Sequence, residues 1–315
     1  MPELPEVETI RRTLVPYLLG QVVRAVHLFT PTVWRGQDPA AMVGCYVTGL
    51  DRRGKHLLIS VSRSPGSAHG DAASRPGASD QPPGGAAARS ADGGGGAERS
   101  AGSGGPALGD LVLHVHLGMT GRLIFLPPGD PAPDRHVHAR FSFDRGELSY
   151  QDTRRFGYLE LLPGSSLGDH PRLRLGPEPL DGSFTTEVLR GMLAGRRAPV
   201  KAVLLDQHIM AGIGNIYADE ALHRAGVHPV RPAGDLGERE VETLRNALRE
   251  VLEEAIAARG TTFSDYRDGE GRPGEFVSRL CVYGREGEAC PRCGTPVARH
   301  RLGGRSTYFC PRCQK

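Results

Sequence analysis

Long hydrophobic runs are missing from this 315-residue sequence. No stretch approaches the ~20 consecutive apolar residues that a membrane-spanning helix requires. The N-terminal segment is acidic and lacks the hydrophobic region of a signal peptide. These absences exclude a protein that spans the membrane through helices, and they predict a cytoplasmic location without membrane partners.

Large apolar side chains are missing from residues 64–107, which contain no Val, Ile, Leu, Met, Phe, Trp, Tyr or Cys. Such a segment cannot bury enough apolar surface to offset the conformational entropy that ordering would cost. It separates two apolar runs with the composition of strands, Lys55–Val61 and Asp110–Leu117. We therefore predict a disordered insertion between two strands, which leaves their pairing intact.

A strong excess of one charge is also absent, because the net charge is only +3. The distribution is uneven, however. Residues 285–315 contain seven Lys or Arg and two Glu, a net charge of +5, so the remainder carries −2. A basic C-terminal tip favours a polyanionic partner, with nucleic acid as the leading candidate. A basic tail that only improves solubility is the alternative.

Four of the six cysteines form two C-x-x-C pairs, which are Cys290 with Cys293 and Cys310 with Cys313. Pairs separated by sixteen residues are typical of a closed tetrahedral zinc site, and disulfides are rare in cytosolic proteins. Four thiolate ligands leave no position open for water, so the spacing predicts one structural Zn²⁺. The remaining Cys45 and Cys281 are expected to be inert thiols.

The first residues are Met1-Pro2-Glu3-Leu4-Pro5-Glu6. Initiator Met is normally removed before a residue as small as Pro, which would leave a secondary amine at Pro2. An α-amino group has a pKa near about 8, so a useful fraction is unprotonated at neutral pH. A free amine beside the carboxyl groups of Glu3 and Glu6 can attack a carbonyl-like carbon and form a Schiff base. The alternative is a simple helix start, in which Pro and Glu favour the first turn.

Two periodicities divide the chain. Short apolar or alternating runs, separated by Gly, Pro or Asp, predict strands at Val22–Phe29, Tyr46–Leu50, Lys55–Val61, Leu111–Leu117, Leu123–Leu126, His138–Phe143, Leu148–Gln151 and Tyr158–Leu162. Helical patterns follow at Phe184–Leu193, Val200–Gln207, Asn215–Ala225 and Glu238–Arg259. With a helix near residues 5–19, these patterns predict an α+β protein in which an antiparallel β-sandwich precedes a helical domain.

In their order along the chain, several motifs resemble the formamidopyrimidine-DNA glycosylase family, bifunctional bacterial repair enzymes for oxidised purines. The motifs are Pro2–Thr9, Arg53-Gly-Lys55, His116-Leu-Gly-Met119-Thr-Gly121, Asp152-Thr-Arg154-Arg155-Phe156-Gly157, Leu175–Leu180, Gly212-Ile-Gly-Asn215-Ile-Tyr217 and the four paired cysteines. The resemblance covers the chain except residues 64–107. It implies a catalytic β-sandwich domain at 1–174, a helix-two-turn-helix DNA-binding domain at 175–280 and a zinc finger at 281–315.

The resemblance also implies catalytic roles. The amine of Pro2 would attack the sugar C1′ of the damaged nucleotide and displace the base, while Glu3 would protonate the ring oxygen. The resulting iminium would allow strand cutting by β- and then δ-elimination. Lys55 would bind a flanking phosphate and assist the first elimination, and Arg305, on a hairpin, the second. Glu6 would be a supporting carboxylate, with helix packing as a nearly equal interpretation.

Binding roles for double-stranded DNA are implied in the same way. A flipped base leaves a gap in the stack, and an unbranched Met, a planar Arg and an aromatic ring suit the wedge that fills it. The resemblance assigns the wedge to Met119, Arg154 and Phe156, with Arg154 facing the orphaned cytosine. Contacts to the DNA backbone are implied for His136, Arg155, Arg196, Lys201 and Asn215. For the histidine and the arginines, an ordinary surface position is the alternative.

Residues 261–274 would cover the extruded base. Ser264 stands where relatives often have a basic residue, so we expect base contacts there from backbone amides rather than from this side chain. Two other functions stay open: an endonuclease VIII-like glycosylase for oxidised pyrimidines, and a catalytically silent DNA-binding relative. Leu4 and the Arg154–Phe156 wedge favour the purine enzyme. The protein is expected to act as a monomer.

Overall fold

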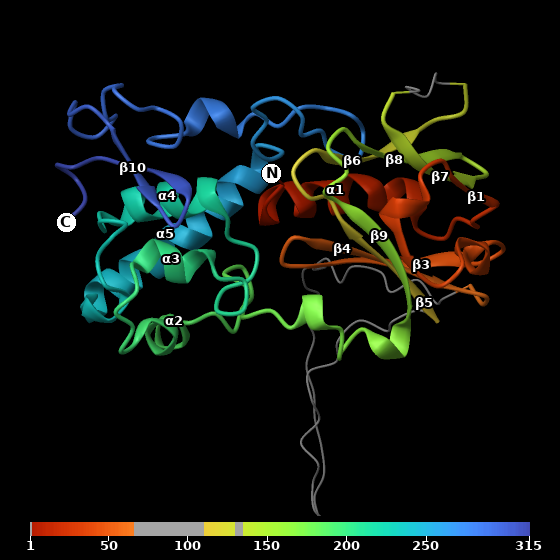
Figure 1. Ribbon diagram of the computed structural model, residues 1–315, viewed down its shortest axis with the longest axis horizontal. Coiled ribbons are helices and arrows are strands. Elements are labelled where there is room, and N and C mark those ends of the chain that lie inside the picture. The colour runs from red at the N-terminus through yellow and green to blue at the C-terminus, as the bar shows by residue number, and fades with distance from the viewer. Residues whose placement is uncertain (1, 66–109, 130–134) are drawn as a thin grey trace, which may run out of the picture. The chain divides into compact units, whose positions relative to one another are not determined.

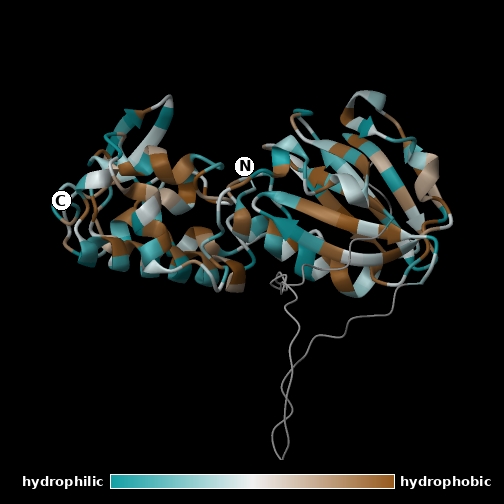
Figure 2. Ribbon diagram, turned by 90° about the horizontal axis from the view of Figure 1, so that it is seen from below, coloured by the Kyte–Doolittle hydropathy of each residue, from teal (hydrophilic) through white to brown (hydrophobic). Residues whose placement is uncertain are grey.

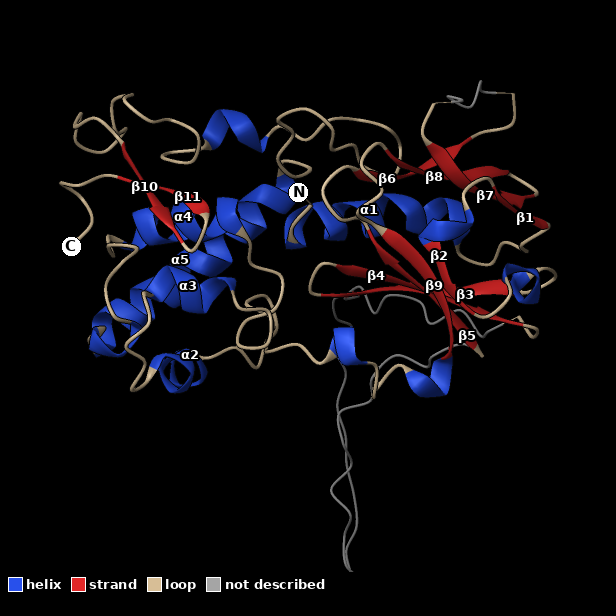
Figure 3. Ribbon diagram, in the orientation of Figure 1, coloured by secondary structure: helices blue, strands red, loops and turns tan. Residues whose placement is uncertain are grey.

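The computed structural model describes residues 2–65, 110–129 and 135–315. The predicted insertion at 64–107 lies almost entirely outside these residues. The first half of the chain forms two β-sheets and helix α1 (Leu4–Leu18), and the second half is mainly helical (Figures 1 and 3). The α+β class and the order of its parts are therefore as predicted.

Two sheets make up the sandwich. The four-stranded sheet has the order β1 (Ala25–Leu28), β7 (Val137–Phe143), β8 (Gly146–Asp152), β6 (Gly121–Leu126). The five-stranded sheet has the order β2 (Trp34–Gly36), β9 (Tyr158–Pro163), β5 (Leu111–His116), β4 (His56–Ser62), β3 (Tyr46–Arg53). Among the described strands of these sheets, only β2 and β9 pair in parallel. The predicted antiparallel sandwich is confirmed, with this three-residue edge strand missed because it is too short to show a pattern.

Alternation along the strands separates the core from the outer faces (Figure 2). In β5, Leu113 and Val115 pack into the core that both sheets share with α1. Because successive strand residues point to opposite faces, His114 and His116 lie on the outer face of the same sheet. Lys55, predicted at the start of a strand, instead lies in the turn between β3 and β4, because the chain reverses at Gly54.

Four helices form the second core: α2 (Thr186–Leu193), α3 (Val200–Leu205), α4 (Asn215–Ala225) and α5 (Glu238–Ala257). Helix α5 buries one apolar face, which consists of Val241, Leu244, Ala247, Leu248, Val251, Leu252, Ala255 and Ile256. Helix α2 begins two residues later than predicted, because the Thr185 side chain accepts a hydrogen bond from the Val188 N–H and caps it. Short 3₁₀ helices are η1 (Pro31–Val33), η2 (Pro39–Met42), η3 (Gly164–Ser166), η4 (Pro171–Leu173), η5 (Ala233–Asp235) and η6 (Phe276–Arg279).

Among the helices of the described residues, none combines the length and the apolar character that crossing a bilayer requires.

A β-hairpin lies near the C-terminus, formed by β10 (Ala298–Leu302) and β11 (Arg305–Phe309). Its two-residue turn consists of Gly303 and Gly304, both with positive φ, as tight hairpin turns require. Arg305 is the first residue after the turn, which confirms its predicted position on a hairpin.

A buried ion pair joins this hairpin to the helices. The Lys201 ammonium on α3 lies 2.7 Å from the Asp219 carboxylate on α4. It also donates to the Thr307 hydroxyl at 2.9 Å and to the Ser306 carbonyl at 3.1 Å. Burial lowers the pKa of Lys201 and raises that of Asp219, and their mutual attraction opposes both shifts.

Removing one partner of a buried pair leaves the other charge without compensation, which typically costs ~3–5 kcal/mol. We expect Asp219→Asn to lower the free energy of unfolding by this amount in urea denaturation. Asp144→Asn is the matched control, because its ion pair with Arg24 is exposed on both sides and should contribute below ~1 kcal/mol. Equal losses in the two variants would contradict a structural role for the buried pair.

Candidate active site and metal centre

Glu3 lies against the start of helix α4. Its side chain is 2% exposed, and Oε1 accepts the Ile216 N–H at 3.1 Å. Oε2 is buried without a hydrogen-bond partner among the described residues. One oxygen is thus anchored at a helix N-terminus, where negative charge is favoured, and the other makes no hydrogen bond to a described residue.

Glu6 supports Glu3 from the next turn of α1. Its carboxylate accepts the Glu3 N–H at 2.8 Å, the Thr261 N–H at 2.8 Å and the Tyr217 hydroxyl at 2.5 Å. Burial, and then the charge of Glu3, raise the pKa of Glu6. Glu6 caps its helix and also fixes the backbone of Glu3, so the two interpretations of this residue are compatible.

A cavity of about 230 Å³ opens beside Pro2. Its walls come from the N-terminal segment, two loops of the sandwich, the start of α4 and the segment after α5, and include Pro2, Glu6, Met119, Thr120, Arg154, Ile216, Thr261, Phe263, Ser264, Asp265 and Tyr266. The volume suits one small ring system rather than a drug-sized ligand. The predicted nucleophile, two of the three predicted wedge residues (Met119 and Arg154) and the predicted base-covering segment therefore meet at one cavity.

The turn that carries Lys55 is fixed by Glu178. The Glu178 carboxylate accepts the Gly54 N–H at 2.7 Å and lies 2.6 Å from the Arg52 guanidinium. Arg53 donates to the carbonyls of Leu175 and Gly176 in the same linker. The Leu175–Leu180 motif thus sets the position of the β3–β4 turn.

Lys55 is itself almost buried. Burial lowers its pKa, the negative charge of Glu3 opposes that shift, and the positive charge of Arg305 adds to it. Lys55, Glu3 and Arg305 come from three separate parts of the chain, and their charges act on one another in the structure. A lysine with a lowered pKa is better able to accept a proton at neutral pH.

The predicted wedge residues lie in exposed loops. Met119 is 41% exposed and Phe156 is 55% exposed. The Arg154 guanidinium lies 4.6 Å above the centre of the Phe156 ring. Large apolar side chains that remain exposed are consistent with a role in contacting a partner.

Asp152 connects the two wedge loops and was missed in the sequence. Its buried carboxylate accepts the Thr120 hydroxyl at 2.5 Å, the Arg154 N–H at 3.2 Å and the Gly157 N–H at 2.8 Å. The one signal for this residue in the sequence was its position as the first residue of the Asp152–Gly157 motif.

The predicted backbone-contacting residues divide into three groups. His136, Arg155 and Arg196 are exposed. Asn215, half-buried, is the first residue of α4, and its side-chain amide donates to the Ser306 carbonyl at 2.9 Å. A phosphate contact requires a side chain at the surface. Lys201 is instead buried, with 1% exposure, and its ammonium already contacts three oxygens of the protein.

The segment 261–274 is anchored at several points. The Gly269 N–H donates to the Thr13 hydroxyl at 3.0 Å, and the Phe125 N–H donates to the Gly269 carbonyl at 2.8 Å. Arg259 forms an ion pair with buried Asp268. At the tip of the segment, Phe263 and Ser264 are exposed and line the cavity.

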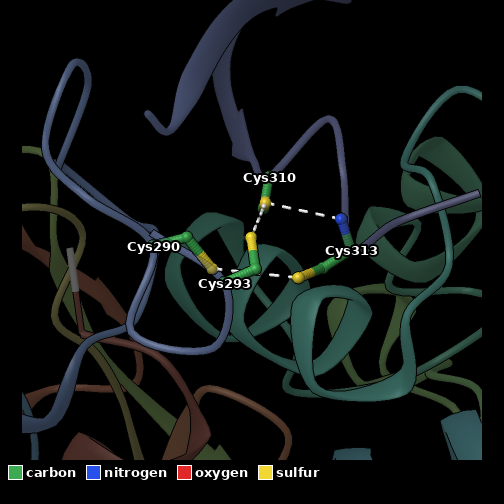
Figure 4. A group of neighbouring side chains, drawn as sticks. All are labelled: Cys290, Cys293, Cys310 and Cys313. Carbon is green, nitrogen blue, oxygen red and sulfur yellow. Dashed lines mark hydrogen bonds between the residues drawn. The ribbon is translucent and has the colours of Figure 1, made fainter. Parts of the chain in front are cut away.

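The four paired cysteines converge at the base of the hairpin (Figure 4). Sulfur–sulfur distances are 4.0 Å for Cys290–Cys313 and 3.4 Å for Cys293–Cys310. Four thiolates at about 2.3 Å from one Zn²⁺ in a tetrahedron would lie roughly 3.8 Å apart, so the cluster fits the ion. His223 Nε2 contacts the Cys290 sulfur at 3.4 Å, as a residue behind a metal ligand often does.

Three protein-family models match the chain. They are the formamidopyrimidine-DNA glycosylase N-terminal domain over residues 1–159, the formamidopyrimidine-DNA glycosylase H2TH domain over 175–267, and the zinc finger found in FPG and IleRS over 287–315. The chain belongs to the formamidopyrimidine-DNA glycosylase family. Membership confirms the resemblance and assigns one structural zinc to the four cysteines.

Relatives match over nearly their full length. A formamidopyrimidine-DNA glycosylase from Moorella thermoacetica is 46% identical, over 96% of this chain and 95% of the relative. The crystal structure of the MutM (Fpg) protein from Thermus thermophilus matches with a TM-score of 0.77 and 40% identity, covering 99% and 98% of the two chains. The Lactococcus lactis FPG mutant G226P, in complex with DNA that contains Fapy-dG, matches with a TM-score of 0.79 and 30% identity over both full chains.

Gly214 provides a test of the Glu3 position in this glycosylase. A Cβ atom at residue 214 would lie 2.3 Å from the carboxyl carbon of Glu3, so Gly214→Ala must displace that carboxylate. Because a positioned proton donor typically contributes 10²–10⁴-fold, we expect base release in a single-turnover assay to slow by about 10²-fold or more.

Gly191→Ala in α2 is the matched control, since a Cβ there meets nothing within 4 Å. It should leave the rate unchanged and stabilise the helix by ~0.5–1 kcal/mol. Normal base release by Gly214→Ala would show that the anchored Glu3 geometry is not needed.

Proposed function

We propose that this protein excises oxidised purines from duplex DNA and then cuts the strand at the abasic site. The observation that carries the proposal is the pairing of Pro2, at the cavity, with a buried Glu3 oxygen that has no partner among the described residues. The L. lactis relative in complex with Fapy-dG-containing DNA supports the same lesion class.

The first step is displacement of the base. With Met1 removed, the Pro2 amine attacks C1′ of the flipped nucleotide, the bond from C1′ to the base breaks, and an iminium forms as the sugar ring opens. Glu3 delivers a proton to the ring oxygen through its free Oε2, while Oε1 stays anchored to the Ile216 N–H. Glu6 acts as a positioning residue, because its carboxylate accepts the Glu3 N–H and holds the backbone of Glu3 in place.

The iminium acidifies the neighbouring sugar C–H bonds, so the strand breaks by β-elimination and then δ-elimination. Burial lowers the pKa of Lys55, which suits it to assist proton removal while it contacts a flanking phosphate. Arg305, exposed at the hairpin turn, contacts phosphate near the lesion and assists the second step.

The wedge closes the gap left by the flipped base. Met119 and Phe156 enter the stack, and Arg154 faces the orphaned cytosine while its guanidinium lies over the Phe156 ring. His136, Arg155, Arg196 and Asn215 contact the DNA backbone. We retain Lys201 only as the residue that fixes the hairpin, because its burial excludes it from solvent.

The proposed division of the chain is a catalytic domain at 1–174, a DNA-binding domain at 175–280 and a zinc finger at 281–315. The protein would act as a monomer on chromosomal DNA in the cytoplasm. Residues 261–274 would cover the extruded base, with backbone amides near Ser264 reading the purine carbonyl.

Borohydride trapping tests the chemistry and the substrate class together. Wild-type protein should form a covalent adduct with a duplex containing 8-oxoguanine or a formamidopyrimidine, and less adduct with an oxidised-pyrimidine duplex. Intact mass should show that Met1 is absent. Pro2→Gly and Glu3→Gln should bind the duplex normally and lose base release.

Each outcome separates the functions still open. Preferential trapping on the oxidised pyrimidine would identify an endonuclease VIII-like enzyme. Binding without any adduct would identify a silent relative, and full activity of a protein that retains Met1 would exclude the amine mechanism.

The zinc finger makes a separate prediction. Cys310→Ser should release zinc and disorder the hairpin, because structural zinc energy is folding energy. Arg305→Ala should keep zinc but reduce the slope of log affinity against log salt by about 1, the loss of one phosphate contact. Metal analysis and DNA binding at several salt concentrations measure both, and a Cys310→Ser protein that loses the zinc of the four-cysteine centre and keeps normal affinity would make the finger dispensable.

A further inference from the structure

A second cluster of metal-binding side chains lies away from the cysteines, on the outer face of the five-stranded sheet. His114 on β5 and Glu160 on β9 are direct partners across the antiparallel ladder. Such partners point to the same face, so their side chains meet. His170, just before η4, brings a third group from the segment that follows β9.

Distances within the cluster suit a single ion. Glu160 Oε2 lies 3.5 Å from His114 Nδ1 and 3.3 Å from His170 Nε2. Ligands about 2.0–2.1 Å from one Zn²⁺ in a tetrahedron lie roughly 3.3–3.4 Å apart, which these separations match. Two histidines and a carboxylate are also a ligand set that zinc uses, with a fourth position left for water.

Burial gives the cluster an unsatisfied group. His114 is 0% exposed, and its Nδ1 makes no hydrogen bond to any described residue. A buried polar nitrogen in that state is costly unless a ligand binds it. Glu160 and His170 retain slight exposure, which leaves a route from solvent.

A second histidine orients the first. His56 Nδ1 lies 2.8 Å from His114 Nε2, so one of these nitrogens carries the shared proton and the other accepts it. If His114 donates from Nε2, its Nδ1 presents a lone pair towards Glu160 and His170. Metal-binding histidines regularly donate their other ring N–H in this way.

The positively charged side chain of Arg172 would compete with a metal ion for Glu160. Its guanidinium lies 3.4 Å from Glu160 Oε2, but the side chain is 48% exposed. Because this guanidinium is about half exposed, water can replace the carboxylate as its partner when a cation binds Glu160.

We propose that His114, Glu160 and His170 form a second metal site, for a divalent first-row transition ion with zinc as the best fit. The ion would join the sheet to the segment that leads into the Leu175–Leu180 linker. This inference is independent of the DNA chemistry, because none of the three ligands belongs to the proposed catalytic set.

Metal stoichiometry tests the site in the full chain with the four-cysteine centre loaded. After equilibrium dialysis against Zn²⁺, wild-type protein should contain two zinc ions per chain. His114→Ala and His170→Gln should each contain one, and Cys310→Ser should contain one. Thermal unfolding of wild-type protein should shift to higher temperature with added Zn²⁺, and that shift should be lost in His170→Gln.

His27→Gln is the matched control, because His27 is exposed on the other sheet and should leave two zinc ions bound. The His170→Gln variant is included because His114→Ala, in a buried strand, can fail to fold. His170 lies outside the strands, so its replacement should leave the fold intact. One zinc ion in wild-type protein, or two in folded His170→Gln, would overturn the proposal.

Discussion

The contact between the N-terminal carboxylates and the helical half is the constraint on which the rest of the site depends. Glu3 accepts the Ile216 N–H, and Glu6 accepts the Tyr217 hydroxyl, across sequence separations of 213 and 211 residues. The amine of Pro2 therefore reaches its place only when both halves of the chain have folded. Buried carboxylates are stabilised when hydrogen bonds replace water, and here the supporting bonds also hold the residues proposed to react.

Carboxylates that accept backbone N–H groups also hold the other loops of the candidate site. Glu178 fixes the turn of Lys55, and Asp152 fixes the two wedge loops. Glu220 accepts the N–H groups of three successive residues, Cys281 to Tyr283, at the entrance to the zinc finger. A carboxylate offers about four acceptor positions, so one side chain can fix several backbone groups where no helix or strand does so.

Local patterns accounted for most of the fold. Strand alternation located eight of the nine described sandwich strands, and the helical pattern located α5, which begins at the predicted Glu238 and ends at Ala257 rather than Arg259. The errors arose where the decisive contact is distant. Lys55 was assigned to a strand because the turn at Gly54 depends on Glu178. Lys201 was predicted to contact DNA, and its burial beside Asp219 on another helix could not be seen from the sequence.

By itself, the sequence determined the class of the fold, the zinc-binding cysteines, the family and the candidate nucleophile, because spacing, periodicity and short motifs are local properties. Tertiary structure alone decided which oxygen of Glu3 is free, that Asp152 joins the wedge loops, and that His114 meets His170. These facts depend on hydrogen bonds and burial between residues far apart in the chain. Only folding brings such groups within bonding distance and removes the water that would otherwise satisfy them.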